Sequence, residues 1–585
     1  MKNKIFLVAL FAASTLMMVA CSNKSYKTYD KELSIVSLLN YSSEEENATD
    51  IKGLTADGKL KLKFIEGEDY IPYIDPFSYF TFIPDGLREK CTYVDTDNEV
   101  DFVFSVKDAK ASVRIFPKEK QVLFENQISY IYEDEDNTSV SLRTKFENKF
   151  DKTKMVDQVI NYSEYGFNIF REDGKTYFPL AFLEPLVTAS HNTTVFYNYD
   201  KLYVYREPEA LAKYKLLVDG KETTVLDEMK AKTQDVMPEY LRKFNKNCLY
   251  YMFDNFYGLN DVKGITKMST YFESQDYSKS LLSDKAEVRA NALDLMISAL
   301  NDGHTDALYP ATAWGEDVDQ SLPQSLKKDR EALEKALKDE RNRVYKSLNL
   351  DLDDVRYSAD GKTAVITLDE FGVDSFIYKE DKKLKTDAEL AESDHFFKLL
   401  TNLREIDKKT GVSNVVIDMS VNAGGNSGTM VKILNLISST NKAEITFRDS
   451  ATNVFYTFGS SIDSNNDGKY DVNDVYGKKY KFFILTSPVA FSCGTAMPFY
   501  VSHQNLGYIV GHHQGGGECA LNQFVLPNGQ IMAISSTLHV STMEEGELIG
   551  DEAGVEAEVS YSYFDFYDIE KLNTKIKSFR EFMKI

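Results

Sequence analysis

Residues 481–519, KFFILTSPVAFSCGTAMPFYVSHQNLGYIVGHHQGGGEC, carry the pattern around which the rest of the chain is organised. The apolar run 482–485 ends at the turn formed by residues 486–488 and predicts a buried strand. The apolar segment 495–501 predicts a buried helix, and residues 506–510 predict a second strand. The stretch therefore predicts strand, helix and strand in succession, as in an α/β core.

Ser492 falls near the start of the predicted helix, where the chain leaves the edge of the sheet. The free N–H groups and the positive dipole end of a helix N-terminus favour negative charge beside a nucleophilic oxygen. Serine is also a common N-cap residue, whose hydroxyl only satisfies unpaired backbone amides. From this stretch alone both interpretations, nucleophile and cap, stay open.

Length and composition predict several domains. A chain of 585 residues is too long for one ordinary core, and 43% hydrophobic with 13% aromatic residues supply material for several. The net charge of −23 argues against a polyanionic partner. We therefore expect a multidomain protein that does not bind nucleic acid.

The N-terminus predicts a secreted, lipid-anchored protein. Lys2 and Lys4 precede an apolar run that is too short to span a bilayer, so residues 1–20 predict a signal peptide. Residues 16–21, LMMVAC, resemble a bacterial lipobox, which implies that Cys21 is acylated after cleavage. We expect location in the bacterial cell envelope, facing the periplasm or the surface; the alternative is a plain secreted protein.

The remaining chain divides by composition. A tether covers residues 21–32, and residues 33–206 are rich in short aromatic and β-branched runs, which predict a β-rich N-terminal region. Within that region GEDYIPYIDPF at 67–77 and GKTYFPLAFL at 174–183 share one order of residues and predict a duplicated small α+β module. Three further parts follow: a helical segment over 207–310, a charged helical linker or cap over 311–350, and an α/β core over 351–585.

His304 follows the most regular helical pattern of the chain, residues 286–300. That helix is predicted to end at the C-cap signal Asn301-Asp302-Gly303. His304 therefore lies at the end of an element and not on a helix face. A single histidine is more often a surface or core residue than a catalytic base, so both interpretations stay open.

A glycine loop follows another buried strand. Residues 415–418 predict the strand, 419–428 read MSVNAGGNSG, and 429–437 predict a helix. Backbone amides at such a helix start can hold a phosphate or an oxyanion. Because no G-x-x-x-x-G-K-[ST] motif occurs there, the oxyanion is favoured.

Residues 463–474, DSNNDGKYDVND, have oxygen ligands in the order of an EF-hand-type calcium loop. The ligand set is Asp463, Asn465, Asp467, Asp471 and Asp474. The last position is Asp where the motif prefers a bidentate Glu, and a solvated hairpin is the alternative. Apart from this structural calcium, no cofactor is expected.

Four short motifs in this order resemble the tail-specific and tricorn-type serine peptidases, the relatives of C-terminal processing peptidases and retinoid-binding-protein repeats. They are DGHT at 302–305, DMSVNAGG at 418–425, TSPVAFS at 486–492 and GVEAE at 554–558. The resemblance covers roughly residues 286–560, about half of the chain. It implies a crotonase-like (ClpP-type) α/β catalytic core and hydrolysis of peptides or unfolded protein tails.

The resemblance also implies residue roles. Ser492 would attack the scissile carbonyl, His304 would take its proton, and the N–H groups of Gly424 and Cys493 would hold the oxyanion. The processing branch of the family has a lysine where this chain has GGGE at 515–518, so a Ser-Lys dyad is not expected.

A carboxylate near the last motif would orient the imidazole. Asp551 has the better spacing but is shorter than the usual Glu, and Glu552 is the alternative. His512 and His513 are rival bases close to the nucleophile in sequence, but adjacent side chains on an extended segment point opposite ways, so at most one could help.

The cysteines fit an oxidising compartment. Without Cys21, an even number remains, and Cys493 and Cys519 flank the glycine run. They predict a disulfide, and two buried thiols are the alternative.

These patterns together predict an α+β multidomain protein that is a lipid-anchored, cell-envelope serine endopeptidase. The alternative is a catalytically inactive binding lipoprotein that retains the peptidase fold, since fold alone does not fix function. An esterase is disfavoured because Ala490 stands where the first glycine of G-x-S-x-G would be.

Overall fold

The structure is a computed structural model of the chain. It describes residues 26–37, 56–82, 88–106, 109–125, 139–189, 193–205, 211, 215–218, 221–230, 236–310, 312, 314, 325–374, 377–379, 383–513, 515–544 and 547–585. The predicted signal peptide and Cys21 lie outside these residues. Among the helices that are described, none is long and apolar enough to cross a membrane.

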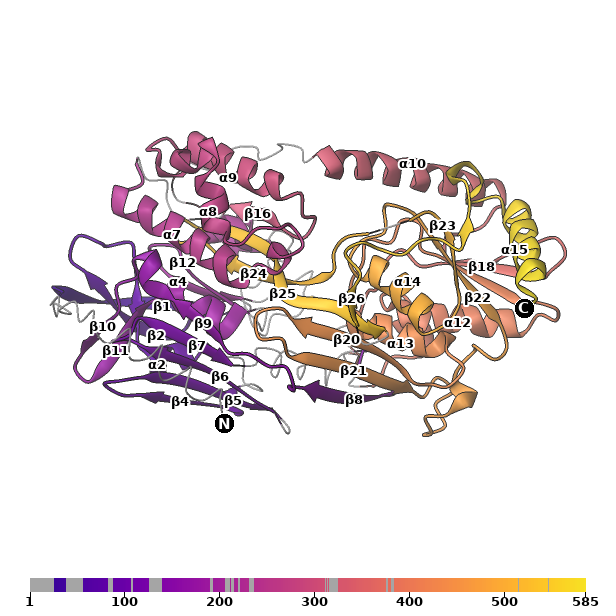
Figure 1. The fold of residues 1–585 in the computed structure, drawn as a ribbon, viewed down its shortest axis with the longest axis horizontal. Coiled ribbons are helices and arrows are strands. Elements are labelled where there is room, and N and C mark those ends of the chain that lie inside the picture. Colours follow the sequence, from indigo (N-terminus) through magenta and orange to yellow (C-terminus); the bar gives the residue numbers. More distant parts are fainter. Residues whose placement is uncertain are drawn as a thin grey trace, which may run out of the picture.

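Two sheets form the N-terminal region, which is β-rich as predicted (Figure 1). The first has the strand order β10 (Phe170–Glu172), β11 (Lys175–Pro179), β3 (Tyr73–Ile74), β2 (Ala56–Ile65), β1 (Thr28–Ser37), β13 (Leu202–Tyr205) and β12 (Thr194–Tyr197). The second has the order β4 (Cys91–Asp95), β5 (Val100–Val106), β6 (Ala109–Phe116), β7 (Gln121–Glu125) and β9 (Gln158–Asn161). Both contribute to one hydrophobic core.

The two similar sequence pieces form similar structures that lie side by side. β3 is followed by α2 (Pro76–Phe80), and β11 is followed by α4 (Leu180–Leu183). The two strands pair antiparallel, with Phe178 opposite Ile74. The N–H of Leu180 donates to the carbonyl of Pro72 at 3.0 Å. Each piece is therefore a strand followed by a short helix.

A helical segment packs on the same core as these sheets. It contains α7 (Glu239–Phe256), α8 (Met268–Glu273) and α9 (Ala286–Leu300). α9 ends as predicted, because Asn301 adopts a left-handed conformation with φ 48°. Its buried face includes Met296 and Leu300, whereas Leu295, which the helical period assigned to this face, is 45% exposed.

Shorter elements complete this half of the chain. They are the hairpin β14 (Lys215–Val218) and β15 (Lys221–Thr224), α6 (Val225–Met229), and the single-turn helices η3 (Tyr162–Tyr165), η4 (Glu184–Thr188), η6 (Gly258–Asn260) and η7 (Asp276–Leu282).

The C-terminal half contains a six-stranded sheet between two layers of helices. Its order is β17 (Arg356–Tyr357), β18 (Thr363–Thr367), β19 (Asn414–Asp418), β22 (Lys481–Thr486), β23 (Tyr508–Gly511) and β27 (Val559–Ser560). All neighbours from β18 to β27 pair in parallel, and β17 pairs antiparallel.

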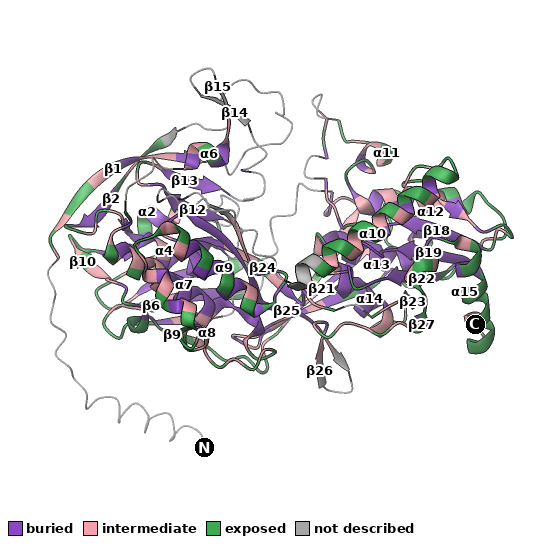
Figure 2. Ribbon diagram, turned by 90° about the horizontal axis from the view of Figure 1, so that it is seen from above, coloured by how far each residue is buried: buried purple, intermediate pink, exposed green. Residues whose placement is uncertain are grey.

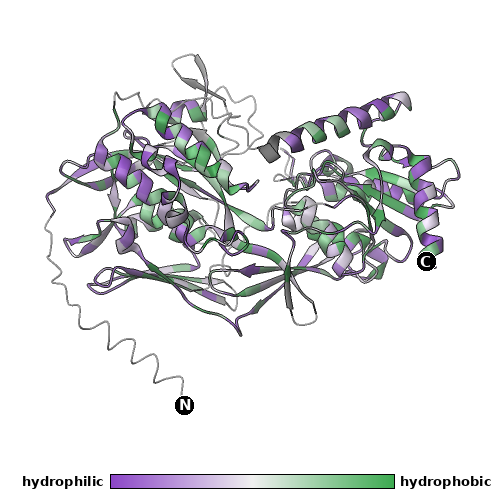
Figure 3. Cartoon of the chain, turned by 45° about the horizontal axis from the view of Figure 1, so that its top comes forward, coloured by the Kyte–Doolittle hydropathy of each residue, from purple (hydrophilic) through white to green (hydrophobic). Residues whose placement is uncertain are grey.

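Alternate residues of these strands face opposite helix layers. Ile417 and Ile484 pack in the cluster that includes α12 (His395–Asp407), α13 (Ser427–Ile437) and α14 (Cys493–His503). Val416 and Phe483 pack in the cluster that includes α10 (Ser325–Ser347) and α15 (Ile569–Met583). A parallel sheet covered on both faces requires such continuous apolar strands. The strands are buried in Figure 2, and in Figure 3 α10 alternates hydrophilic and hydrophobic positions.

The helical stretch over residues 387–407 is two helices, α11 (Asp387–Leu390) and α12. The break is explained by Asp394, whose side chain accepts the N–H of Phe397 at 3.0 Å and starts a new helix.

A further sheet joins the two halves. Its order is β16 (Asp306–Pro310), β25 (Gln530–Glu544), β20 (Ala443–Asp449), β21 (Phe455–Ile462) and β8 (Thr144–Asp151), and β24 (Cys519–Val525) and β26 (Glu547–Gly550) also pair with β25. Figure 1 shows β25 running from one half into the other. Because β16 begins two residues after His304, this sheet holds His304 beside the C-terminal half. The whole is a mixed α/β multidomain fold.

Candidate active site

Three loops meet where adjacent parallel strands β19, β22 and β23 end. Ligand sites of open α/β sheets form at such carboxyl ends. The loops are joined through their backbones: the N–H of Phe491 donates to the carbonyl of Asn422 at 3.2 Å, and the N–H of Ser492 donates to the carbonyl of Gly516 at 3.4 Å. The serine motif is therefore held between the two glycine loops.

Ser492 has a backbone conformation that side chains rarely adopt. Its φ is 56° and its ψ is −129°, and it immediately precedes α14. Such a conformation costs on the order of 1–3 kcal/mol and is found where function requires it. The Ser492 side chain makes no capping hydrogen bond. The cap interpretation is therefore wrong, and the half-buried hydroxyl is available for chemistry.

Gly424 makes this arrangement sterically possible. Its φ is 109°, and a Cβ at this position would lie 2.8 Å from the Cβ of Ser492 and 2.9 Å from the carbonyl oxygen of Phe491. Only glycine therefore lets the loop after β19 lie against the Ser492 turn.

The two predicted oxyanion donors differ in this structure. The N–H of Cys493, the first of α14, donates to no other residue among those that the structure describes. The N–H of Gly424 donates to the Asn422 Oδ1 at 2.8 Å. Cys493 therefore offers a free donor, whereas Gly424 has to share or release Asn422 before it can bind an oxyanion.

His304 packs against the residue that precedes Ser492. Its ring lies 4.7 Å from the Phe491 ring, centre to centre, at an interplanar angle of 66°. A Cβ at Gly303 would lie 2.7 Å from the Phe491 Cζ, so the chain before His304 also touches this ring. His304 therefore packs against the residue that directly precedes Ser492 in the chain. No hydrogen bond joins His304 to Ser492 here, and catalytic hydrogen bonds are often long before substrate binds.

The His304 imidazole is 7% exposed, and burial lowers its pKa from 6.5 to about 4. Asp302 opposes this shift, and Arg330 adds to it. The Nδ1 atom is buried without a hydrogen-bond partner. His304 is therefore neutral at pH 7 and able to accept a proton.

No hydrogen bond joins either predicted carboxylate to His304 among the residues that the structure describes. Asp551 is fully buried, and neither of its carboxylate oxygens has a hydrogen-bond partner. Burial, with Glu518 and Glu552 nearby, raises the pKa of Asp551 well above its usual range. Glu552 accepts the N–H of Glu518 at 3.1 Å. Burial and the neighbouring acids favour the neutral form of Asp551, and Glu552 is hydrogen-bonded to the backbone of Glu518, so the carboxylate that orients the imidazole stays a prediction.

Asp302 is the acidic residue whose charge acts on His304. Its carboxylate accepts the backbone N–H of His304 at 3.1 Å, the Thr305 hydroxyl at 2.6 Å and the Ser535 hydroxyl at 3.0 Å. Asp302 therefore fixes the backbone that carries the imidazole.

Sequence reasoning missed a buried pair beside the second glycine loop. His539 Nδ1 lies 2.6 Å from Glu518 Oε1, and His539 Nε2 lies 3.1 Å from the carbonyl of Gly258. Because a carbonyl only accepts, Nε2 carries a proton, and a second proton lies between Nδ1 and the carboxylate. The pair ties the loop beside Ser492 to η6. No motif marks His539, which lies inside the long strand β25.

The rival histidines have other partners. The His512 ring stacks on Tyr563 with ring centres 3.9 Å apart, and His513 Nδ1 lies 3.3 Å from Glu556 at the surface. Neither contacts Ser492.

Cys493 and Cys519 are free thiols, so the predicted disulfide is not formed in this structure. The Cys519 Sγ instead lies 3.8 Å from both ring nitrogens of His539. Burial and the nearby Asp551 raise the pKa of Cys493 to about 12, so this thiol does not compete with Ser492 as a nucleophile. Thiol labelling of unfolded, unreduced protein checks the disulfide prediction.

The predicted calcium ligands are engaged in a hydrogen-bonded loop that contains η8 (Val472–Asp474). Asp463 accepts the N–H groups of Asp467 and Gly468, and Asp474 accepts those of Asn465 and Asp471. Within the described part of the chain, no group of three or more acidic, His or Cys side chains converges on a metal position. The calcium site therefore stays a prediction, which calorimetry on chelator-treated protein checks.

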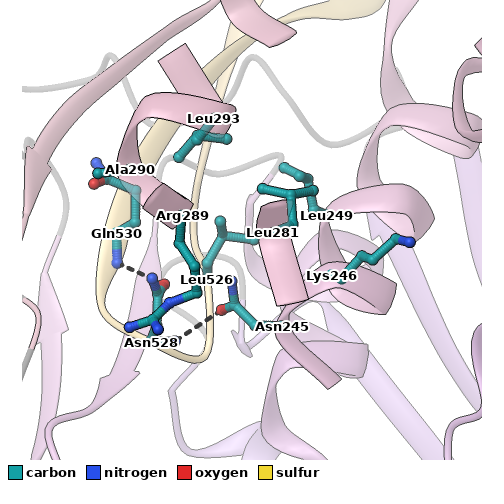
Figure 4. Close-up of a pocket in the computed structure, with 10 residues that line it drawn as sticks. All are labelled: Asn245, Lys246, Leu249, Leu281, Arg289, Ala290, Leu293, Leu526, Asn528 and Gln530. Atoms are coloured by element: carbon teal, nitrogen blue, oxygen red, sulfur yellow. Dashed lines mark hydrogen bonds between the residues drawn. The ribbon is translucent and has the colours of Figure 1, made fainter. Parts of the chain in front are cut away.

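A cavity of the helical segment, drawn in Figure 4, lies away from Ser492. Its lining includes Arg289 and Asn245, and the Asn245 Oδ1 accepts the N–H of Asn528 at 2.9 Å. It is lined by side chains of α7, η7, α9 and the turn before β25, and none of its lining residues belongs to the candidate site.

Part of the chain matches a known protein family. Residues 362–560 match the model of peptidase family S41. No curated protein matches the chain.

Similar solved structures include peptidases and a lipoprotein. A putative peptidase from Parabacteroides merdae is 13% identical, with a TM-score of 0.35, over 55% of this chain and 90% of its own. A lipoprotein from Streptococcus agalactiae is 13% identical, with a TM-score of 0.35, over 59% of this chain and 99% of its own. The photosystem II D1 C-terminal processing protease is 15% identical, with a TM-score of 0.25, over 35% of this chain, which spans only 44% of that protease.

The matched residues hold the parallel strands β18, β19, β22 and β23, the Gly424 loop and Ser492. His304 precedes them in sequence and reaches the site from the helical segment. Residues 362–560 therefore form a domain of peptidase family S41, a family of serine-type peptidases.

Proposed function

We propose that this protein is a serine endopeptidase that hydrolyses peptides or unfolded protein tails, with Ser492 as nucleophile and His304 as base. One observation carries the proposal: Ser492 is held in a strained conformation at the start of α14 while its hydroxyl is not used as a cap. A residue that only stabilised the helix would relax, and its hydroxyl oxygen would accept a hydrogen bond from the backbone amides of the first turn.

The chemistry follows from the positions of the groups. The Ser492 Oγ attacks the scissile carbonyl carbon as His304 takes the hydroxyl proton. The developing oxyanion binds the free N–H of Cys493, and Gly424 joins it if its bond to Asn422 is given up. Collapse of the tetrahedral adduct expels the amine, which takes the proton from His304. The same imidazole then deprotonates a water that hydrolyses the acyl-enzyme and restores Ser492.

Which carboxylate stabilises the protonated imidazole of His304 is a separate part of the proposal. Asp302, which acts electrostatically on His304, supplies the negative charge in the present geometry. Asp551 or Glu552 serves this role only after a rearrangement that brings one of them to Nδ1. The buried, unpartnered Nδ1 is the position that such a carboxylate would occupy.

The fold relationship and the location belong to the same proposal. A crotonase-like core is supported by the parallel sheet between two helix layers, with the site at the strand ends. Lipid anchoring at Cys21 in the cell envelope is supported by residues 16–21. Metabolic labelling with a fatty acid, lost in Cys21→Ser, tests the anchor.

The decisive experiment is labelling with a neutral fluorophosphonate probe. We expect the wild type to react, Ser492→Ala to be unlabelled, and a folded His304→Ala to be unlabelled or very slow. His512→Ala is the control and keeps its labelling, because His512 packs on Tyr563. If the wild type neither reacts nor cleaves unfolded protein, the non-enzymatic lipoprotein is the correct alternative.

A further inference from the structure

Arg330 of α10 lies against the turn that carries the nucleophile. Its Nε donates to the carbonyl of Val489 at 3.0 Å. Its guanidinium carbon lies 4.5 Å from the centre of the Phe491 ring, the same ring that contacts His304 at 4.7 Å. Phe491 therefore touches both the base and an arginine, one residue before Ser492.

The three arginines of α10 differ in their partners. Arg341 binds Asp369 through both terminal nitrogens, at 2.6 and 2.5 Å, and Arg343 binds Glu340 at 2.8 and 2.5 Å. The terminal nitrogens of Arg330 have no acceptor in the described part of the chain. The arginine beside the candidate nucleophile is thus the one of the three without a carboxylate.

Among the described residues, no acid forms an ion pair with Arg330. Glu334, one turn further along α10, forms an ion pair with Lys338 at 2.6 Å. Burial lowers the pKa of the half-buried Arg330 guanidinium, and Glu334 only partly opposes this. A desolvated cation with idle donors is unfavourable unless an anion joins it.

Resting on the proposed peptidase function, we propose that Arg330 binds a carboxylate of the peptide substrate, placed within a few residues of the scissile bond. The planar guanidinium offers paired N–H donors that match a carboxylate. Because the guanidinium lies beside the ring that also contacts His304, a carboxylate bound there holds the chain next to Ser492. Arg330 is then a specificity-determining residue for this reaction.

A substrate carboxylate has two sources, the C-terminus of the peptide or an internal Asp or Glu side chain. A panel of four otherwise identical quenched peptides separates them. One peptide has a free C-terminus close to the cleavage site and one has the amide there. The other two are amidated and carry Glu or Gln at a position near the cleavage site.

The full-length wild type, Arg330→Gln, Arg330→Lys and the control Arg343→Gln are compared by kcat/KM on this panel. We expect the wild type to prefer one carboxylate peptide over its neutral match by about tenfold or more, mainly through KM. Arg330→Gln loses this preference, and Arg330→Lys keeps part of it. Arg343→Gln keeps it in full, because Arg343 is exposed and paired with Glu340.

The outcomes separate this inference from the function on which it rests. If the wild type fails to react with the fluorophosphonate, the proposed function is overturned. If it reacts but hydrolyses all four peptides equally, or if Arg330→Gln keeps the preference, only the Arg330 inference is overturned. Should Arg330→Gln fail to fold, a reduced preference in folded Arg330→Lys supports the inference and an unchanged one contradicts it.

Discussion

The starts of α13 and α14 form an instructive pair. Both helices follow adjacent parallel strands, β19 and β22, and both begin after a short polar residue. Asn426 has φ −73° and ψ 126°, and its side chain accepts the N–H of Thr429 at 2.9 Å. Ser492 has φ 56° and ψ −129° and caps nothing. One residue stabilises its helix, and the other is strained with its hydroxyl free.

Packing around each residue explains the difference. The Ser492 turn is fixed by the Gly424 loop on one side and the 515–518 loop on the other, where a Cβ at Gly517 would lie 2.5 Å from the Ser492 N. Its backbone cannot relax without separating these loops. Whether a polar residue at a helix start caps the helix or keeps its side chain free therefore depends on the segments packed around it, and not on its residue type.

The largest expected difference between the two helix starts is in activity. Ser492→Ala should lower peptide hydrolysis by at least about a thousandfold, because it removes the attacking oxygen. Asn426→Ala should leave the activity of the folded fraction within a few-fold. Hydrolysis rates normalised to folded protein measure both, and equal losses would mean that Ser492 is also structural.

The steric role of Gly424 gives the next effect. Gly424→Ala should lower the free energy of unfolding by about 2–4 kcal/mol, from strain at positive φ and overlap with Ser492. Gly411→Ala is the matched control, since Gly411 has φ 100° but only the Lys362 Nζ nearby, at 3.8 Å. It should cost about 1 kcal/mol. Urea denaturation compares the two, and equal losses would contradict the close approach.

The pH dependence tests the buried base. Burial lowers the pKa of His304 to about 4, so kcat/KM should rise with pH along a limb near 4 and not near 6.5. Between these values the unfolded chain binds a proton that folded His304 does not, so its contribution to the free energy of unfolding falls as pH falls from 6.5 towards 4.

Rate profiles from pH 3 to 9, with His513→Asn as control, measure the limb. If kcat/KM instead rises with an apparent pKa near 6.5, the catalytic imidazole is exposed to water, which argues against the buried His304 as the base.

The smallest effect concerns strain itself. Ser492→Gly should unfold with a free energy about 1 kcal/mol higher than Ser492→Ala, because glycine adopts positive φ without strain. At Asn426, which is not strained, both substitutions remove the cap and should lower the free energy of unfolding relative to wild type. Asn426→Gly should lower it by a few tenths of a kcal/mol and Asn426→Ala by about 1 kcal/mol. Thermal or urea unfolding of the four variants gives both differences, and Ser492→Ala as stable as Ser492→Gly would mean that no strain is stored.

The sequence predicted much of the local structure around the site. Strands β19 and β22 and helices α13 and α14 lie where their apolar runs indicate, and α9 ends at Asn301. These features depend on periodicity and caps within a few residues. The apolar pattern alone does not mark the break between α11 and α12, which depends on the side-chain cap at Asp394.

The partners of the site residues could not be predicted. His539 bonds to Gly258, 281 positions away, and Arg330 contacts Val489, 159 positions away. No local pattern marks such pairs, because they depend on which strands become neighbours. The family resemblance pointed to His304 and Ser492 and also to Asp551 and Glu552, whose role at the imidazole stays a prediction. Asp551 is buried without a hydrogen-bond partner, and Glu552 accepts the N–H of Glu518.

By itself the sequence determined the elements: apolar alternation makes the strands, and polar residues and glycines set where helices begin and end. Only the tertiary structure decided which side chains are free to react. Long-range packing forces Ser492 into a strained turn, moves His304 out of water beside Phe491, and leaves Arg330 without a carboxylate. The physical reason is that burial and strain arise from contacts between distant segments, and no single stretch of chain contains them.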